Sequence, residues 1–165
     1  MIITNIKLKN YRQYKDVNID LITNDKKPIT IIQGANGSGK TNLLNAITWC
    51  LYGHESHLGD KYKGLPISNN IHLNKVTIDQ HFEVSVEITI KVRDNLSFLF
   101  VRTIECVKTG NNNIDVVGKR SGELKVYSRI NRNWDLTRQP EYRVQALLPE
   151  TLQEYFFFDG ERLNA

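Results

Sequence analysis

The chain has 165 residues, of which 40% are hydrophobic and 24% charged, and its formal net charge is +4. This composition is typical of a folded globular protein, and no apolar run approaches the length of a membrane span. We therefore expect one domain or one lobe in the cytoplasm. Two isolated cysteines, Cys50 and Cys106, offer no metal-ligand spacing.

The net positive charge lies entirely in the first half of the chain. Residues 1–80 hold ten Lys or Arg and six Asp or Glu, whereas residues 81–165 hold twelve of each. A basic half is typical of a surface that faces nucleotide or DNA. An excess of four charges is nevertheless too small to identify a nucleic-acid-binding protein by itself.

The first elements predicted are two strands joined as a hairpin. Residues 2–9 alternate apolar and polar side chains, and the second alternating run follows at Val17, Ile19 and Leu21. Residues 10–15 form the expected connection. A polar turn is predicted at 24–28, and the apolar residues 29–33 predict a buried strand.

A helix is predicted next, over residues 42–52. Leu43, Leu44, Ile47 and Leu51 would form its apolar face, and Gly53 is a typical helix stop. Residues 54–75 are rich in polar residues and glycine and predict a long loop with one helical turn.

Between the expected strand and helix lies a recognisable motif. Residues 34–41 read Gly-Ala-Asn-Gly-Ser-Gly-Lys-Thr and fit G-x-x-x-x-G-K-[ST], the Walker A phosphate loop. Glycines allow backbone N–H groups to turn around an anion, and the following helix N-terminus adds positive potential. Lys40 can reach the β- and γ-phosphates, and Thr41 can offer its hydroxyl to Mg²⁺.

The second half of the chain predicts antiparallel strands. Apolar and polar residues alternate over 82–92 and return over 96–107 after the turn Asp94-Asn95. Shorter runs at 114–117 and 124–130 follow further turns. We expect these four strands to form a meander. Trp49 and Trp134 are expected to be packing residues.

The last segment predicts short helices followed by an apolar run. Residues 143–148 predict a helix that ends at Pro149, and residues 151–155 predict another helical stretch. Tyr155 to Phe158 are aromatic and end in Asp159, which is compatible with a buried strand and a Walker B carboxylate. Alternatively, Asp159 caps a helix that begins near Gly160.

Three segments carry a family resemblance. Residues 6–14, Ile-Lys-Leu-Lys-Asn-Tyr-Arg-Gln-Tyr, resemble the N-terminal strand and turn of SMC-like ATPases, a superfamily that includes RecF and RecN. Residues 33–47 resemble the phosphate loop and helix of the same proteins. Leu148-Pro149 and residues 155–162 resemble DndD, the ATPase of DNA phosphorothioation systems.

The resemblance implies an α/β phosphate-loop NTPase fold of the ABC-ATPase head type. The chain would be the N-terminal lobe, with an antiparallel β-subdomain and few helices. Residues 1–53 would hold the strands, phosphate loop and first helix, 54–75 a loop, 76–135 the meander, and 139–165 a helical and Q-loop-like region. A coiled coil and a C-terminal lobe with the signature motif and Walker B carboxylate would lie outside this sequence.

The resemblance also implies cofactors, partners and site residues. ATP and Mg²⁺ would bind, the lobe would pair with its own C-terminal lobe and a second ATPase head, and DNA and other subunits of a DNA-processing complex would be partners. Lys40 and Asp159 would be catalytic, and Thr41 and Asp159 would contact Mg²⁺. Nucleotide would be held by Arg12, Gly34, Asn36, Gly37, Ser38, Gly39, Lys40, Thr41 and Asn42. Asp159 departs from the Q-loop glutamine of the wider family.

Three functions remain open from the sequence. The first is an ATPase head in DNA phosphorothioation, repair or phage defence, which hydrolyses ATP as a full-length dimer and is nearly inactive as this chain alone. The second is a transporter-type ATP-binding cassette. The third is a non-catalytic module that retains a nucleotide site.

Overall fold

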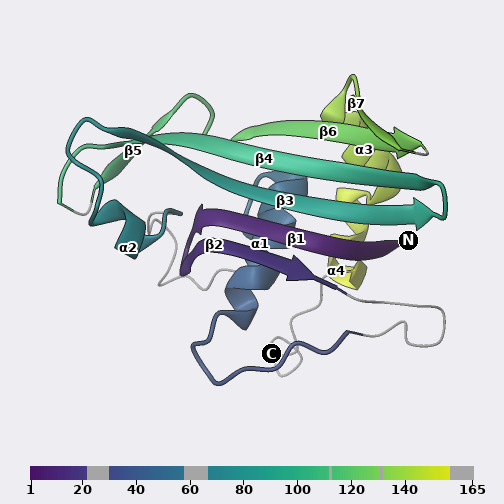
Figure 1. Cartoon of the computed structure of the whole chain (residues 1–165), viewed down its shortest axis with the longest axis horizontal. Coiled ribbons are helices and arrows are strands. Elements are labelled where there is room, and N and C mark those ends of the chain that lie inside the picture. The colour runs from purple at the N-terminus through teal and green to yellow at the C-terminus, as the bar shows by residue number, and fades with distance from the viewer. Residues whose placement is uncertain (22–29, 58–66, 112, 131, 157–165) are drawn as a thin grey trace.

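Period-two alternation of apolar and polar residues produces the long strands that the sequence predicts. The computed structural model describes residues 1–21, 30–57, 67–111, 113–130 and 132–156. β3 (His81–Arg93) and β4 (Leu96–Lys108) form an antiparallel hairpin, in which Ile88 lies opposite Phe100. This pair is the centre of the sheet in Figure 1.

The predicted N-terminal hairpin belongs to the same sheet. β1 (Ile2–Tyr11) pairs antiparallel with β2 (Tyr14–Asp20) on one side and with β3 on the other. The strands extend further toward each other than the sequence indicates, and Tyr11 lies opposite Tyr14. The turn between them is therefore confined to Arg12 and Gln13.

The prediction of a simple meander is wrong in its strand order. β5 (Ile114–Val117) and β6 (Glu123–Ile130) both pair with β4, at different parts of its length, and β7 (Asn133–Leu136) adds an unpredicted strand after β6. The order is β2-β1-β3-β4-β6-β7, with β5 beside β4. The thirteen-residue β4 is long enough to pair with two short strands in succession.

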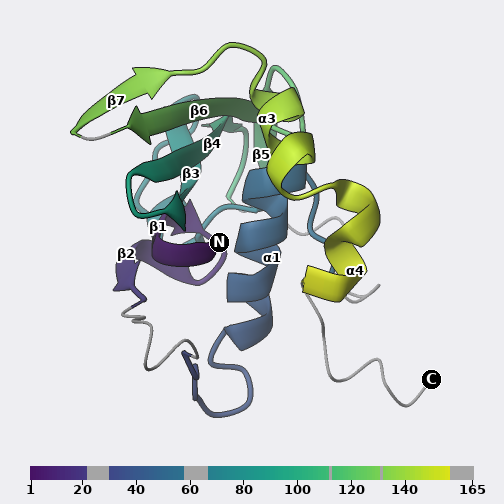
Figure 2. The same cartoon turned by 90° about the vertical axis from the view of Figure 1, so that its right-hand side faces the viewer.

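One helix covers the middle of the sheet. α1 (Lys40–Tyr52) contacts β3 and β4, and Gly53 ends it in the left-handed conformation, as predicted. Figure 2 shows α1, α3 and α4 on one side of the sheet. The core residues of the strands face this side, for example Val86, Phe100 and Val126.

The buried face of α1 differs from the prediction. Leu43 and Leu51 are buried, but Leu44 and Ile47 are only partly buried, and the largest buried side chain is Trp49. The helix is enclosed on more than one side, because the segment after Gly53 folds back along it. Buried polar residues of α1 meet that segment: the backbone N–H of Ser56 donates to Thr48 Oγ1 at 3.4 Å, and that of His57 donates to Asn45 Oδ1 at 2.7 Å.

The predicted strand before the phosphate loop is not formed in the described residues 30–33. These residues have no regular structure, and Ile31 is 76% exposed. A strand of this composition needs paired neighbours and cover on both faces. The antiparallel sheet supplies neither, because residues 30–33 lie outside its strand order. The polar turn predicted at 24–28 falls outside the described residues.

The remaining helices are short. A single turn, α2 (Asn70–Leu73), interrupts the segment after α1 and is capped by the side chain of Asn69. At the other end of the chain, α3 (Pro140–Leu147) leads into a 3₁₀ turn (Glu150–Leu152) and α4 (Gln153–Phe156). The helical stretch predicted for residues 151–155 is thus confirmed, and the strand predicted to include Phe156 is wrong at that residue. Phe157, Phe158 and Asp159 lie outside the described residues.

Trp49 and Trp134, both predicted to be packing residues, differ in how far they are buried. Trp49 is buried against Tyr11, with ring centroids 5.7 Å apart. Trp134 is only half-buried on β7, where the guanidinium of Arg129 lies 4.6 Å from its ring centroid. An edge strand leaves one side of its residues open to solvent, which accounts for the difference.

Both cysteines are buried thiols, as predicted for Cys50. Burial raises the pKa of Cys50 to about 12 and that of Cys106 to about 11. Relative to an ordinary thiol of pKa 9.0, the thiolate fraction of Cys50 falls about 1000-fold. We expect neither cysteine to react with iodoacetamide at pH 8 in the folded chain, and both to react in 6 M guanidinium chloride. Mass spectrometry after a timed pulse tests this, and rapid labelling of the folded chain would contradict it.

Candidate functional site: a phosphate loop and its surrounding side chains

The glycine-rich loop leads directly into the N-terminus of α1. Gly37 has a φ of 79° and Gly39 a φ of 102°, backbone conformations that favour glycine. Gly39 is the N-cap residue, and its carbonyl accepts the first helical hydrogen bond from Leu43 at 2.9 Å. No described side chain caps this end, and its first turn has no acidic residue. The backbone N–H groups here are suited to an anion.

Lys40 lies across the loop. Its ammonium group donates to the carbonyl oxygens of Gly34 at 2.7 Å and Ala35 at 3.0 Å. The loop also closes through a hydrogen bond from Ser38 N–H to Ala35 O at 3.1 Å. The side chains of Asn36, Ser38, Lys40 and Thr41 are exposed. The predicted phosphate-binding residues are thus gathered in one accessible turn.

The turn between β1 and β2 touches this helix N-terminus. The hydroxyl of Tyr14 donates to Gly39 O at 3.0 Å, and the side-chain amide of Asn42 donates to Gln13 Oε1. A Cβ atom on Gly39 would overlap the Gln13 amide. Gly39 is therefore required both by its backbone conformation and by the close approach of Gln13.

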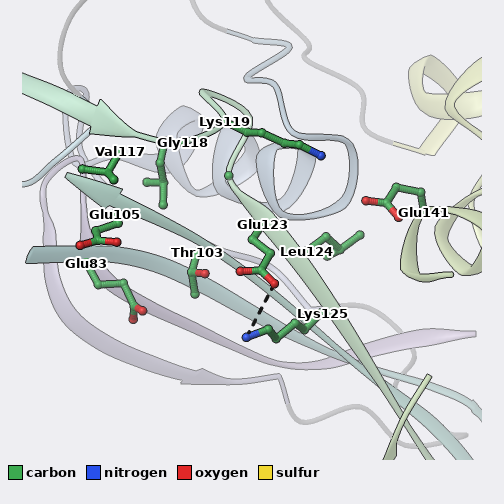
Figure 3. Close-up of a pocket in the computed structure, with 12 residues that line it drawn as sticks. Glu83, Thr103, Glu105, Val117, Gly118, Lys119, Glu123, Leu124, Lys125 and Glu141 are labelled. Atoms are coloured by element: carbon green, nitrogen blue, oxygen red, sulfur yellow. Dashed lines mark ion pairs between the residues drawn. The ribbon is translucent and has the colours of Figure 1, made fainter. Parts of the chain in front are cut away.

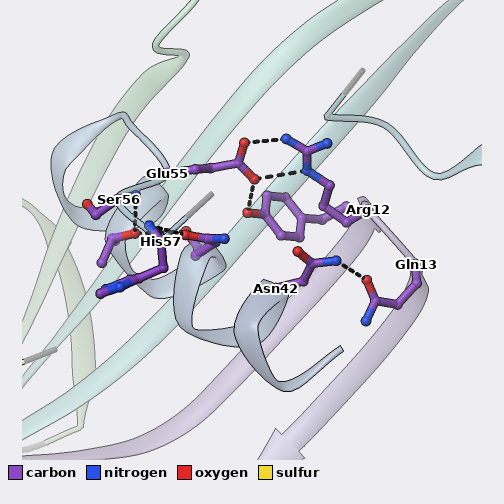
Figure 4. Close-up of polar contacts among 9 residues, drawn as sticks. Arg12, Gln13, Asn42, Glu55, Ser56 and His57 are labelled. Atoms are coloured by element: carbon purple, nitrogen blue, oxygen red, sulfur yellow. Dashed lines mark hydrogen bonds and ion pairs between the residues drawn. The ribbon is translucent and has the colours of Figure 1, made fainter. Parts of the chain in front are cut away.

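Arg12 occupies the turn predicted for it, but its guanidinium lies on Glu55. Nε donates to Glu55 Oε1 at 3.0 Å, Nη2 donates to Oε2, and the hydroxyl of Tyr11 donates to Oε1 (Figure 4). Burial alone would lower the pKa of Arg12, but the hydrogen bond and charge of Glu55 outweigh it and raise the pKa. Burial, followed by the negative charge of Glu55, raises the pKa of Tyr11.

The structure brings together most of the predicted site, with additions. Asn42 adjoins the loop and contacts Gln13, and Arg12 precedes Gln13 with its guanidinium on Glu55, whereas Asp159 lies outside the described residues. Sequence reasoning missed Glu55, Gln13 and Tyr14 as neighbours of the site. Gln13 and Tyr14 fall within the resemblance motif, but Glu55 lies in a polar stretch with no spacing signal of its own.

A pocket away from the phosphate loop has a different chemical character. It has a volume of about 590 Å³ and lies along β4 between the end of β5 and the start of β6 (Figure 3). Its charged lining residues are Glu83, Glu105, Lys119, Glu123, Lys125 and Glu141. Four carboxylates against two ammonium groups disfavour a phosphate ligand. The pocket shares no lining residue with the phosphate loop or the β1–β2 turn.

The described part of the chain offers neither a metal cluster nor a membrane-spanning helix. Its His, Cys, Asp and Glu side chains form no group of three or more that could hold a metal ion. None of its helices has the length and apolar character required to cross a membrane.

The class of protein follows from the sequence match together with this geometry. The family described as "AAA domain" matches residues 5–164, and the chain belongs to this family. Membership implies a nucleotide site. The predicted fold class, a phosphate-loop NTPase lobe of the ABC-ATPase head type with an antiparallel β-subdomain and few helices, is confirmed.

The chain is also similar in sequence to curated proteins whose names state roles in DNA repair. The chain is 28% identical over 116 residues to the DNA replication and repair protein RecF of Clostridium beijerinckii, covering 67% of this chain and 29% of RecF. It is 45% identical over 65 residues to RecF of Natranaerobius thermophilus, and the match covers 39% of this chain and 16% of that RecF. It is 30% identical over 95 residues to the DNA double-strand break repair Rad50 ATPase of Methanococcus maripaludis. That match covers 58% of this chain and 8% of the Rad50 ATPase.

A solved structure also aligns with the whole chain. It comes from work on ATP-driven dimerisation and DNA-stimulated activation of SMC ATPases, with a TM-score of 0.48 and 16% identity, and covers 100% of this chain and 85% of that one. The chain spans less than a third of the length of the curated relatives it matches.

Proposed function

We propose that the chain is the ATP-binding N-terminal lobe of an SMC-like ATPase that acts in DNA processing. The observation that carries this proposal is the phosphate loop, with its left-handed glycines, leading into a helix N-terminus without a described side-chain cap. Backbone N–H groups and the ammonium of Lys40 would both interact favourably with the negative charge of a triphosphate.

The proposed ligand is ATP with Mg²⁺. Gly34, Asn36, Gly37, Ser38, Gly39 and Lys40 would hold the phosphates, and the exposed hydroxyl of Thr41 would contact Mg²⁺. In this assignment Lys40 leaves the carbonyls of Gly34 and Ala35 for the phosphate oxygens. Arg12, Asn42 and Asp159 complete the proposed site.

The exposed segment before the loop supports a two-lobe head. Ile31 is 76% and Ile32 is 49% exposed, although a strand leading into a phosphate loop is normally buried between parallel neighbours. We propose that strands of a C-terminal lobe supply those neighbours. The lobe division at 1–53, 54–75, 76–135 and 139–165 belongs to the same proposal.

Dimerisation and partners follow as further parts of the proposal. A second head would complete each ATP site, and ATP binding would close the pair. The similarity to RecF and Rad50, whose names state roles in DNA repair, supports DNA as a partner. A role in phosphorothioation or antiviral defence rests on the resemblance of residues 148–149 and 155–162 to DndD, and a cytoplasmic location remains a prediction.

Two alternatives carry their own distinguishing features. A transporter-type cassette does not normally open with the sequence Asn10-Tyr11-Arg12. A relic nucleotide module would not need Lys40 and Thr41, and both are present.

The test is a paired measurement on the 165-residue chain. We expect weak but saturable Mg-ATP binding by calorimetry and negligible phosphate release, because the Walker B carboxylate of the proposed head is supplied by the other lobe. A non-hydrolysable ATP analogue is expected to bind with an affinity similar to that of ATP. Rapid multiple turnover by this chain alone would contradict the half-site assignment, and no saturable binding would contradict the proposal itself.

A further inference from the structure

In the ion pair between Arg12 and Glu55, the backbone of Arg12 is held in place by hydrogen bonds. Arg12 adopts a φ of 48°, which is uncommon for a residue with a side chain. Its N–H donates to Ile67 O at 2.8 Å, and its carbonyl accepts from the side-chain amide of Asn69 at 2.7 Å. A strained conformation persists only where the surroundings hold it, so the position of this turn is specified by its contacts.

The Glu55 end is attached to the phosphate-loop helix. The two residues after Glu55 donate their backbone N–H groups to Thr48 and Asn45 in the middle of α1. Because these acceptors are buried side chains of α1, the segment that carries Glu55 is held against the helix that begins at Lys40. Figure 4 shows Glu55 reaching from this segment to Arg12.

The pair therefore joins the β1–β2 turn to α1 through a buried contact. The side chains of Arg12 and Glu55 are only 10% and 12% exposed. The surface pair Lys7–Glu87, by contrast, is 3.8 Å apart with side chains 54% and 34% exposed. Solvent screens such a surface pair, whereas loss of one partner from a buried pair leaves an uncompensated charge.

The turn held by this contact lies against the helix N-terminus. Gln13 and Tyr14 follow Arg12 immediately, and they contact Asn42 and Gly39, respectively. A displacement of the turn would therefore change the surroundings of the N–H groups proposed to bind phosphate. Small displacements of this kind reduce the function of a preorganised site.

We propose that Glu55 is a positioning residue of the nucleotide site. Through Arg12 and Tyr11 it holds the β1–β2 turn against α1, so that Gln13 and Tyr14 keep their contacts with Asn42 and Gly39. This inference rests on the proposed nucleotide function and deepens it, because it assigns a role to a residue outside the phosphate-loop motif.

The first test is Glu55→Gln, which keeps the size and one acceptor oxygen but removes the charge. Titration with a fluorescent methylanthraniloyl-ATP and Mg²⁺, well below the melting temperature, is expected to show affinity reduced on the order of tenfold. In the nucleotide-free protein, amide hydrogen exchange over residues 37–42 is expected to accelerate. A purely stabilising residue would lower the melting temperature without changing these two quantities.

The matched control is Glu150→Gln. Glu150 pairs with His54, the residue before Glu55, but its side chain is 52% exposed. The control changes the net charge equally and is expected to leave affinity and exchange unaltered. A double-mutant cycle is completed by Arg12→Ala and by the double variant Arg12→Ala/Glu55→Gln. The double variant is expected to bind methylanthraniloyl-ATP no more weakly than Arg12→Ala does.

The outcomes separate the two proposals. Absence of saturable binding by the unaltered chain would contradict the nucleotide function. Normal or tighter binding by a folded Glu55→Gln chain would overturn the positioning role alone. If Glu55→Gln does not fold, Tyr11→Phe removes only one hydrogen bond to Glu55, and an unchanged affinity in that variant would likewise overturn the inference.

Discussion

Lys40→Ala is expected to weaken Mg-ATP binding at least tenfold, which corresponds to about 1.4 kcal/mol. The ammonium group contacts two loop carbonyls, so it already lies over the turn that would hold the phosphates. A hydrogen bond to a charged group contributes about 1.5–3 kcal/mol, and binding would exchange neutral carbonyl partners for charged phosphate oxygens. Calorimetric titration of both chains measures the difference.

The control for Lys40 is Lys7→Ala, which removes one positive charge from an exposed strand position. We expect normal ATP affinity in that variant. Because Lys40 is exposed, its replacement is expected to leave the melting temperature nearly unchanged. Equal affinity of Lys40→Ala and the unaltered chain would instead favour a site elsewhere or a relic loop.

Arg102→Ala is expected to lower the free energy of unfolding by about 3 kcal/mol. Arg102 is 5% exposed, and its guanidinium donates to Cys50 O at 2.9 Å, Leu51 O at 3.2 Å and Ser121 O at 3.1 Å. It thus satisfies carbonyls in the last turn of α1, where a positive charge also complements the helix dipole. Burial lowers its pKa, but an arginine remains protonated at neutral pH.

Urea denaturation measures this effect, with the midpoint compared at constant slope. Arg129→Ala serves as the control, because Arg129 is partly exposed and lies on Trp134, a contact that contributes about 0.5–1 kcal/mol. A loss below about 1 kcal/mol for Arg102→Ala would show that water replaces the guanidinium at these carbonyls.

Local pattern was sufficient to predict most strands and the helix that follows the phosphate loop. The β3–β4 hairpin was predictable because alternation continues over both strands and a short turn separates them. Gly53 was predictable as a helix end because left-handed glycine commonly occupies that position. These features depend on neighbours in sequence.

Features that depend on distant partners were not predictable. The pairing of β5 and β6 with the same strand depends on the length of β4, and the exposure of residues 30–33 depends on which strands are present to pair with them. Arg12 was identified in its turn by resemblance, but its contact with Glu55 joins residues 43 positions apart. A single sequence holds no signal for such a pair.

Amide hydrogen exchange with and without Mg-ATP tests the central claim most directly, namely that residues 34–41 hold a triphosphate. We expect slower exchange over residues 34–42 when ATP is present, because their N–H groups would donate to phosphate oxygens, and no change over the β3–β4 hairpin. Adenosine, which lacks phosphates, is expected to give no protection. Absence of protection in this loop at saturating ATP would contradict triphosphate binding by residues 34–41.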